Sequence, residues 1–337
     1  MVAQIDNQYA KARLTKVPVR LLSYALFEGR PLTTKGRWIN PFVFGLLWLQ
    51  RRVPALLRVR KPIFIVGTGR SGTTVLGMVM SMHKSVGFLN EPKAIWHAAF
   101  GQEDLIGSYS QEAARYRLGA EDASDDVRRS MQRMYGWYLT TTCSNRAVDK
   151  YPELIFRIPF VRAIFPDAKF LFLVRNGWDT CHSIEHWSER LGMSEGEKRH
   201  DWWGVNNRKW NLLVDQVARD EPEFSNHLDE LRVLRKHTDM AAVEWTLTMR
   251  EGLRWQASHP EVVHTVQYER LASDPRTVLE EIRKFCELHP DDTFLDYGSR
   301  VLRPARPVQA FPLASVIDQP FRRTMAALGY EGSSAVV

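Results

Sequence analysis

Short apolar runs alternate along this chain with longer segments of helical character. Five of the runs predict buried strands, at residues 62–67, 86–92, 147–152, 169–175 and 261–271. Residues 73–84 are apolar on nearly all sides, as expected of a helix buried under a sheet, and 274–288 predict another helix. This alternation predicts an α/β protein of three layers, with a mainly parallel central sheet flanked by helices. In such sheets, ligands bind at the carboxyl ends of the strands.

The remaining segments suggest how the chain is organised. Residues 1–60 predict a basic, helical N-terminal extension, and 61–332 predict the main domain. Within that domain, residues 100–140 and 188–240 are expected to be helical, and the second of these segments is polar and rich in tryptophan. No internal repeat is visible.

Composition narrows the range of ligands. The 337 residues carry a net charge of +7, which suits an anionic ligand, an acidic polymer or a membrane surface. Dense Lys/Arg tracts are missing, so nucleic acid is not expected as the main ligand. Cys143, Cys181 and Cys286 form no C-x-x-C pair, as is typical of free thiols in a reducing compartment, and a cytoplasmic protein is expected.

One apolar segment near the N-terminus leaves two interpretations open. The stretch "PFVFGLLWL" (41–49) is shorter than the ~20 residues of a spanning helix, and the first residues of the chain lack the apolar core of a signal peptide. Basic residues follow it, and Trp38 and Trp48 lie close by. Residues 38–60 therefore either contact the inner face of a membrane peripherally or form an amphipathic helix packed on the domain.

The first strand leads into a loop of the kind that binds phosphate. The stretch "FIVGTGRSGTTVLG" (64–77) places Gly67, Gly72 and Thr74 on the triphosphatase pattern G-x-x-x-x-G-K-[ST], but Thr73 stands where the lysine belongs. The nearest cation is Arg70. Backbone N–H groups, a helix N-terminus and the Arg70 guanidinium together predict an anion site.

A second anion site is expected at the end of the fourth strand. A triphosphatase needs an aspartate for Mg²⁺ on one of the strands beside the loop, but this strand ends in Arg175. Ser183 follows eight residues later, one to two turns into the next predicted helix. Two separate anion sites suggest a ligand with two separated phosphate-like groups.

The combination of these two blocks resembles the sulfotransferase family, whose donor is 3′-phosphoadenosine 5′-phosphosulfate. The resemblance implies that the loop holds the 5′-phosphosulfate through Gly69, Arg70, Ser71, Gly72, Thr73 and Thr74. It also implies that Arg175 and Ser183 hold the 3′-phosphate and that Tyr268, in "QYERLASDP", lies near the adenosine. Arg303 and Arg306 are weaker candidates for the 3′-phosphate. No metal is expected to be required.

The resemblance also suggests the residue that removes a proton from the acceptor. In "AVDKYPE" (147–153), Lys150 matches the lysine of the family's K-x-H element, but Pro152 stands at the histidine. Family members without this histidine use a glutamate after the second strand, which implies Glu91, and desolvation is expected to raise the pKa of Glu91. His97 and His182 are the alternatives. Arg70 and Lys150 are expected to neutralise charge that develops during transfer.

The acceptor is predicted to be a hydroxyl of a carbohydrate or glycoconjugate. The segment 188–240 mixes polar side chains with rings, and the tryptophans between residues 96 and 255 offer faces that could stack on sugars, among them Trp187, Trp202, Trp203 and Trp210. Peptide tyrosine and a lipid alcohol remain open as acceptors. Three other interpretations are a phosphate-loop kinase or triphosphatase, a non-catalytic protein that binds anions or membranes, and a zinc site in "HSIEH" (182–186).

Overall fold

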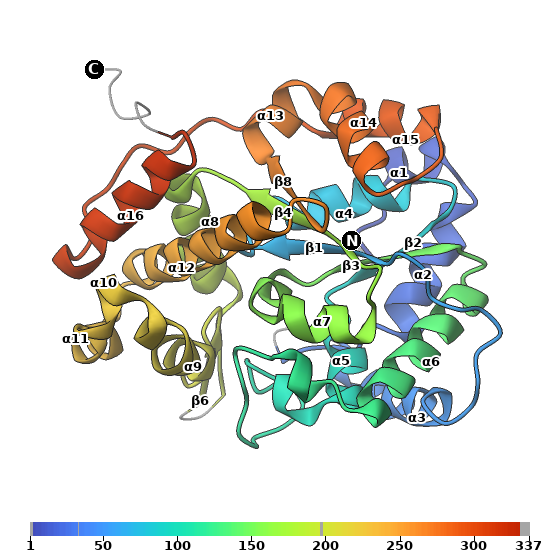
Figure 1. Cartoon of the computed structure of the whole chain (residues 1–337), viewed down its shortest axis with the longest axis horizontal. Helices are drawn as coiled ribbons and strands as arrows, with labels where there is room; N and C mark the ends of the chain where they lie inside the picture. The colour runs from blue at the N-terminus through green and yellow to red at the C-terminus, as the bar shows by residue number, and fades with distance from the viewer. Residues whose placement is uncertain (1–2, 33, 196–197, 331–337) are drawn as a thin grey trace.

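The computed structural model describes residues 3–32, 34–195 and 198–330, and a parallel sheet of five strands runs through its centre (Figure 1). The strand order is β2-β3-β1-β4-β8. The strands are β1 (Ile63–Gly67), β2 (Val86–Asn90), β3 (Arg146–Lys150), β4 (Lys169–Val174) and β8 (Val263–Gln267). Neighbouring strands all pair in parallel. The predicted fold class is therefore confirmed.

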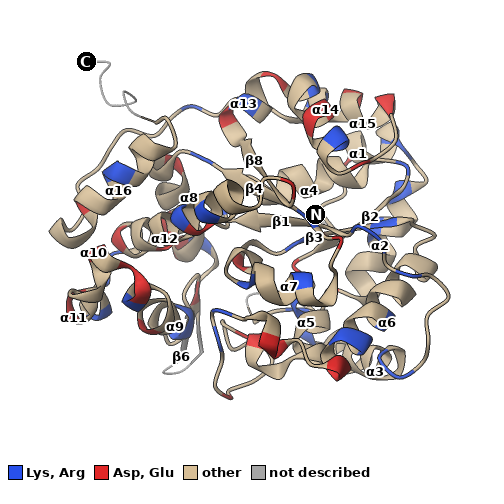
Figure 2. Cartoon of the chain, viewed as in Figure 1, with Lys and Arg blue, Asp and Glu red and all other residues tan. Residues whose placement is uncertain are grey.

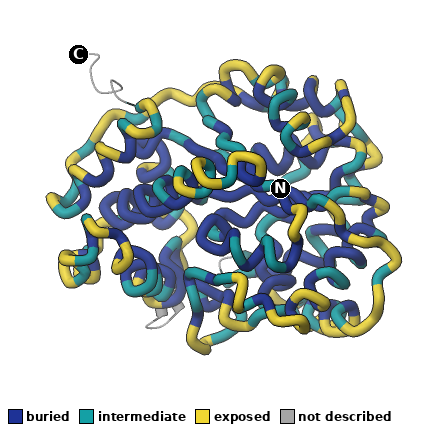
Figure 3. Tube along the Cα trace, in the orientation of Figure 1, coloured by how far each residue is buried: buried dark blue, intermediate teal, exposed yellow. Residues whose placement is uncertain are grey.

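Helices cover both faces of this sheet, and β1 shows why. Ile63 and Ile65 face one hydrophobic core, while Phe64 and Val66 face the other. Because successive side chains of a strand point to opposite faces, a strand that is apolar throughout needs a cover on both sides. Figure 3 shows the central strands as mostly buried, and all five residues of β1 are buried.

The first core lies under the helices α4 (Thr73–Ser81), α14 (Pro275–Phe285) and α15 (Asp292–Val301), with α1 (Asn7–Ala12) at its edge. The second core lies under α3 (Asn40–Gln50), α5 (Lys93–Ala99), α6 (Asp125–Thr141), α7 (Ile158–Ile164), α8 (Gly177–Leu191), α12 (His237–Ser258) and α16 (Ser315–Ala327). The short helices α13 (Tyr268–Ser273), η1 (Arg37–Ile39), η2 (Gly101–Glu103), η3 (Ala120–Asp122) and η4 (Pro152–Arg157) connect these elements.

The N-terminal helices pack closely on the sheet domain. In α2 (Lys16–Leu26), Lys16 is buried and its ammonium donates to the carbonyl of Val86 at 2.6 Å. Ser23, also on α2, bonds the Tyr138 hydroxyl of α6 at 3.0 Å. Arg13, just before α2, pairs with Asp291 at 2.6 Å. These contacts tie α2 and the residues just before it to β2, to α6 and to the start of α15.

Two segments expected to be helical are only partly so. Within 100–140, the stretch before α6 is mostly irregular, and Asp104 holds it by accepting from the backbone N–H groups of residues 107–110 at 2.6–3.1 Å. The segment 188–240 contains a small antiparallel sheet of β5 (Met193–Glu195), β6 (Lys198–Asp201) and β7 (Gly204–Val205). Its helices are α9 (Arg208–Gln216), η5 (Ala218–Asp220), α10 (Pro222–Ser225) and α11 (Leu228–Val233). The prediction of helix was wrong for 193–195, 198–201 and 204–205, because these polar strands lack the apolar alternation that signals a strand, and residues 196–197 lie outside the described residues.

Candidate active site

The predicted site residues follow the carboxyl ends of all five strands of the parallel sheet. The phosphate-type loop 68–72 follows β1, Glu91 follows β2, Lys150 ends β3, Arg175 follows β4 and Tyr268 follows β8. Parallel strands end at one edge of the sheet, so residues distant in sequence meet there.

The loop after β1 has the backbone conformation of a tight anion-binding turn. Arg70 and Gly72 both have positive φ, at 68° and 96°. A Cβ at Gly67 would lie 2.6 Å from the carbonyl oxygen of Leu173 on β4, so only glycine fits between the two strands at this point. The turn leads directly into the N-terminus of α4, where free N–H groups favour an anion.

A cavity of about 280 Å³ lies over this loop, and we call it the loop cavity. It is lined by Gly69, Arg70, Gly72, Thr73, Thr74, Val75, Glu91, Lys150, Arg175, Ser183, Trp187 and Trp202. Most of the predicted site residues are thus brought together around one space. Ser71 is the exception within the loop, because it is buried and its hydroxyl donates to the carbonyl of Thr68 at 2.5 Å.

Cations gather in the loop cavity. The Arg70 guanidinium donates to the Ser183 hydroxyl at 3.2 Å, and Arg175 donates to the carbonyl of Arg70 at 3.2 Å. Burial and the nearby charges of Arg175 and Arg190 lower the pKa of Arg70. Among the described residues that line the cavity, Glu91 is the one carboxylate. A bound anion would relieve this excess of positive charge.

Glu91 stands at the turn after β2 with its carboxylate inside the cavity. Its φ is 51°, and its N–H donates to the carbonyl of Lys150 at 2.7 Å. The Lys150 ammonium donates to one carboxylate oxygen, and Lys93 lies 3.5 Å from the other. Burial raises the pKa of Glu91, but the charges of Lys150 and Lys93 outweigh burial, so the net shift is downward. The expectation of a raised pKa was therefore wrong, and Glu91 is ionised at neutral pH.

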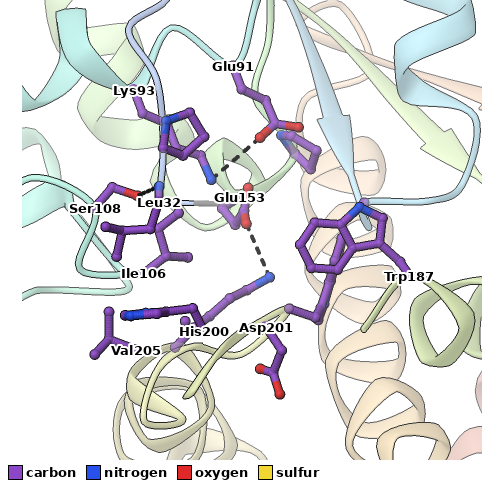
Figure 4. Close-up of a pocket in the computed structure, with 16 residues that line it drawn as sticks. Leu32, Glu91, Lys93, Ile106, Ser108, Glu153, Trp187, His200, Asp201 and Val205 are labelled. Atoms are coloured by element: carbon purple, nitrogen blue, oxygen red, sulfur yellow. Dashed lines mark hydrogen bonds and ion pairs between the residues drawn. The ribbon is translucent and has the colours of Figure 1, made fainter. Parts of the chain in front are cut away.

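A second cavity of about 100 Å³ adjoins the first, and we call it the apolar cavity (Figure 4). Its apolar lining comes from Pro31, Leu32, Ile106, Pro152, Trp187, Trp202 and Val205, and its polar lining includes Glu91, Lys93, Ser108, Glu153, His200, Asp201 and Lys209. Gly69, Glu91, Trp187 and Trp202 line both cavities. The carboxylate of Glu91 therefore lies at the wall between them.

Trp202 is fixed in this wall by a buried ionic network. Its indole N–H donates to Glu244 at 2.7 Å, and the Lys209 ammonium lies 4.6 Å from the centre of its ring. Lys209 also pairs with Glu153 at 3.1 Å and with Glu244 at 2.5 Å. Burial would lower the pKa of Lys209, but Glu244 and Glu153 outweigh burial and raise it. Lys209 and its two glutamates therefore stay ionised, and their contacts hold the ring of Trp202 in place.

This network was not predicted from the sequence. Glu153 lies three residues after Lys150, so its position near a strand end was the available signal. Lys209 and Glu244 carry no such signal, because α9 and α12 bring them to the site only through tertiary packing.

Tyr268 lies outside both cavities and beside the loop. A Cβ at Gly72 would lie 2.5 Å from the ring of Tyr268, and the Arg175 guanidinium lies 4.8 Å from the ring centre. Tyr268 lines a third cavity of about 380 Å³ together with residues 304, 305 and 307. Arg303 and Arg306 are exposed and do not line that cavity, and Arg303 donates to the carbonyl of Ser299 at the end of α15 at 2.8 Å.

The remaining candidates lie away from the loop cavity. His97 packs against Phe44 and Tyr109, and burial lowers its pKa, while His182 is exposed on α8. Trp203 and Trp210 are buried and pack against each other with their ring centres 5.5 Å apart, so they belong to the core. Of the four tryptophans considered for the acceptor, Trp187 and Trp202 line a cavity.

Nothing in the described ranges resembles a metal site or a membrane span. No three His, Cys, Asp or Glu side chains come together there as metal ligands, and His186 is exposed like His182. None of the helices in those ranges is both long and apolar enough to cross a bilayer.

The fold and this site define an α/β protein of the phosphate-loop type, which can be compared with known proteins. The profile of the sulfotransferase family matches residues 62–220, just under half of the chain, and supports the resemblance to this family. The fold is similar to that of the sulfotransferase domain from the Curacin biosynthetic pathway, with a TM-score of 0.50 at 16% identity over 82% of this chain and 99% of that domain.

Two curated relatives match parts of the chain in sequence. The chain is 21% identical over 268 residues to an uncharacterized protein of Aquifex aeolicus, covering 79% of this chain and 30% of that protein. It is 29% identical over 137 residues to a protein-tyrosine sulfotransferase of Drosophila melanogaster, covering 40% of this chain and 27% of that protein. The matches thus span less than a third of either relative.

Proposed function

We propose that this protein transfers a sulfuryl group from 3′-phosphoadenosine 5′-phosphosulfate to an acceptor hydroxyl. The observation that carries the proposal is the shared wall, where Glu91 lies between a cation-rich loop cavity and a largely apolar cavity. An anionic donor in the first cavity and a hydroxyl in the second would meet at that carboxylate.

The lining of the loop cavity supports this donor over a nucleoside triphosphate. Thr73 replaces the lysine that a triphosphatase uses for the β- and γ-phosphates, and Arg175 stands where a metal-binding aspartate would be expected. The loop amides and Arg70 suit the 5′-phosphosulfate, and Arg175 with Ser183 suits the 3′-phosphate. Tyr268, next to Arg175, would then border the adenosine.

The chemistry follows from the contacts of Glu91. Its carboxylate accepts the proton of the acceptor hydroxyl, the hydroxyl oxygen attacks sulfur, and the bond from sulfur to the phosphate oxygen breaks in line. Lys150 and Arg70 stabilise the negative charge on the departing phosphate. As Lys150 turns from Glu91 towards that phosphate, the carboxylate loses its ion pair and becomes a stronger base.

Among the acceptors considered, the apolar cavity favours a lipid alcohol. The carbohydrate prediction relied on several ring faces, but Trp203 and Trp210 are buried in the core. Leu32, Ile106 and Val205 around the remaining rings suit an alcohol whose body is apolar next to the reacting hydroxyl. The Drosophila relative suggests peptide tyrosine as the competing acceptor.

Calorimetry tests the donor. In the presence of EDTA, 3′,5′-bisphosphoadenosine should bind more tightly than AMP, because only the first carries the 3′-phosphate. Loss of charge-assisted bonds worth ~1.5–3 kcal/mol in Arg175→Ala should remove most of the difference, while Arg162→Ala, on the distant helix α7, serves as control. Equal affinity of the wild-type protein for both nucleotides would contradict the proposal.

A further inference from the structure

The helix α3 exposes an apolar face. Its eleven residues, NPFVFGLLWLQ, include no charged side chain. Val43 and Leu47 are buried towards the domain, but Phe42 is 61% exposed and Trp48 is 56% exposed. A surface helix normally carries charged or polar residues on its outer side, so this face lacks the usual adaptation to water.

The exposed apolar residues continue on both sides of α3. We call the set Trp38, Phe42, Trp48, Leu49, Val53, Leu56 and Leu57 the α3 face. It holds seven of the twelve exposed large hydrophobic residues in the described part of the chain. Trp38 and Leu56 are the most exposed of these, at 84% and 81%. Clustered exposure of this kind marks an interaction surface, whereas scattered exposed residues do not.

Positive charge flanks the α3 face on both sides. Lys35 and Arg37 precede it, and Arg52, Arg58 and Arg60 lie within or after it, all of them exposed. The sequence contains no Asp or Glu between Glu28 and Glu91. In Figure 2, α3 itself carries no charged residue, and Arg51, directly after it, pairs with Asp126 of α6 at 3.0 Å.

The α3 face is joined directly to the apolar cavity. Asn40, the first residue of α3, accepts from the N–H of Arg30 and donates to its carbonyl, each at 2.8 Å. Pro31 and Leu32 follow Arg30 and line the cavity. Phe44, in the middle of α3, packs on Tyr109 at 5.1 Å, next to Ser108 of the same lining. The start of α3 and one wall of the cavity therefore form a single packed unit.

We propose that the α3 face docks on an anionic bilayer surface, so that the apolar cavity receives the hydroxyl of a membrane-resident amphiphile. The helix is too short to span a bilayer and would lie in the interface, with its tryptophans at the level of the headgroups. The basic residues match an anionic leaflet. They would also oppose pairing of two copies through the same face, because like charges would meet at the rim.

The part of this inference that concerns the acceptor rests on the proposed sulfuryl transfer, but docking itself does not. Docking is therefore tested without donor, by sedimentation of the protein with vesicles of phosphatidylcholine alone and of phosphatidylcholine with phosphatidylglycerol. We expect binding to the second kind. Phe42→Ser with Trp48→Ser removes two large apolar side chains and should weaken it by more than tenfold. The matched control, Val233→Ser, changes a residue that is 67% exposed on α11 and should bind like wild type.

A second set of variants tests the charges. Arg52→Gln, Arg58→Gln and Arg60→Gln together should lower binding to the anionic vesicles roughly a hundredfold, since each basic residue contributes about one kilocalorie per mole near such a surface. The control is Arg235→Gln, which changes an exposed arginine two residues after the end of α11. Circular dichroism and thermal melting establish that each variant is folded.

Three results would overturn docking: no binding to anionic vesicles, equal binding by the Phe42→Ser/Trp48→Ser variant, or a dimer of the wild-type protein that this variant dissolves. The acceptor is then tested by transfer of labelled sulfur to a long-chain alcohol in anionic vesicles and to a short water-soluble analogue. We expect only the first reaction to fall in the α3-face variants. Transfer to the soluble alcohol alone would refute the membrane acceptor. No transfer to either, with vesicle binding intact, would refute the proposed function and leave docking supported.

Discussion

Substitution of Gly69 by alanine should disturb both cavities at once, through Trp202. A Cβ at residue 69 would lie 2.8 Å from Cζ2 of Trp202, and closer still to Cη2. Carbon atoms in ordinary contact are ~3.5–4.0 Å apart, so either the loop or the ring must move by about 1 Å. The backbone of Gly69 does not have positive φ, so the effect would come from the ring and not from backbone strain.

The ring is poorly able to yield. Its N–H bond to Glu244 and its contact with Lys209 would both be lost if it moved. Overpacking of this kind costs about 1–3 kcal/mol of stability. If the loop moves instead, a displacement of that size at the reacting group costs roughly 10²-fold in turnover.

A double-mutant cycle measures this contact. Urea unfolding and turnover are compared for wild type, Gly69→Ala, Trp202→Ala and the double variant. Because Trp202→Ala removes the ring, adding Gly69→Ala to it should change little, and the coupling between the two sites should reach ~0.5–3 kcal/mol. Gly101→Ala is the control, since no atom lies within 4 Å of its Cβ position. If Gly69→Ala has the same effect with and without the ring, the reasoning is refuted.

Two further predictions concern carboxylates. Glu91→Gln keeps the shape of the side chain but cannot accept a proton, so turnover should fall by ~10²–10⁴-fold. Calorimetry should find the binding of 3′,5′-bisphosphoadenosine nearly unchanged. Near-normal turnover of Glu91→Gln, together with loss of activity in His182→Ala, would assign the base to the histidine. Burial raises the pKa of Asp149 from 3.8 to about 7, against hydrogen bonds from Tyr135 and Trp96 that lower it. Between pH 3.8 and about pH 7, the folded state then holds a proton that the unfolded chain has lost. The free energy of unfolding should therefore fall by up to ~1.4 kcal/mol for each unit by which the pH rises in this range. Asp149→Asn should flatten that slope in urea titrations at several pH values, and an unchanged slope would exclude Asp149 as its source.

The fold was largely predictable because the central strands β1 and β4 are apolar on both faces. The predicted run 169–175 corresponds closely to β4 (Lys169–Val174), since a short and continuous apolar stretch is typical of a strand that is buried on both sides. The end of a strand was harder to predict where a helix follows the strand without a break. The run 261–271 was predicted as one strand, but β8 ends at Gln267 and α13 begins at Tyr268. The hydrophobic pattern alone does not mark such a junction.

The site was predictable where residues follow strand ends, and less so elsewhere. Arg70, Glu91, Lys150 and Arg175 could be selected because the parallel sheet brings its carboxyl ends together. The adjacent residues Trp202 and Trp203 could not be told apart, although one lines both cavities and the other is buried beside Trp210. Which of two neighbouring rings faces a cavity depends on the packing of α9 and α12, and this information is spread over distant parts of the chain.

Under the proposed function, the shared wall of the two cavities has a consequence for hydrolysis of the donor without transfer to an acceptor. Water is also a hydroxyl compound, and a water molecule beside Glu91 could attack the sulfuryl group and release free sulfate. The apolar cavity has a volume of only about 100 Å³, which limits how many water molecules can stand next to the carboxylate when no acceptor is bound. Enlarging this cavity to admit a bulkier acceptor would therefore also admit water, so that a gain in acceptor range would be accompanied by hydrolysis of the donor.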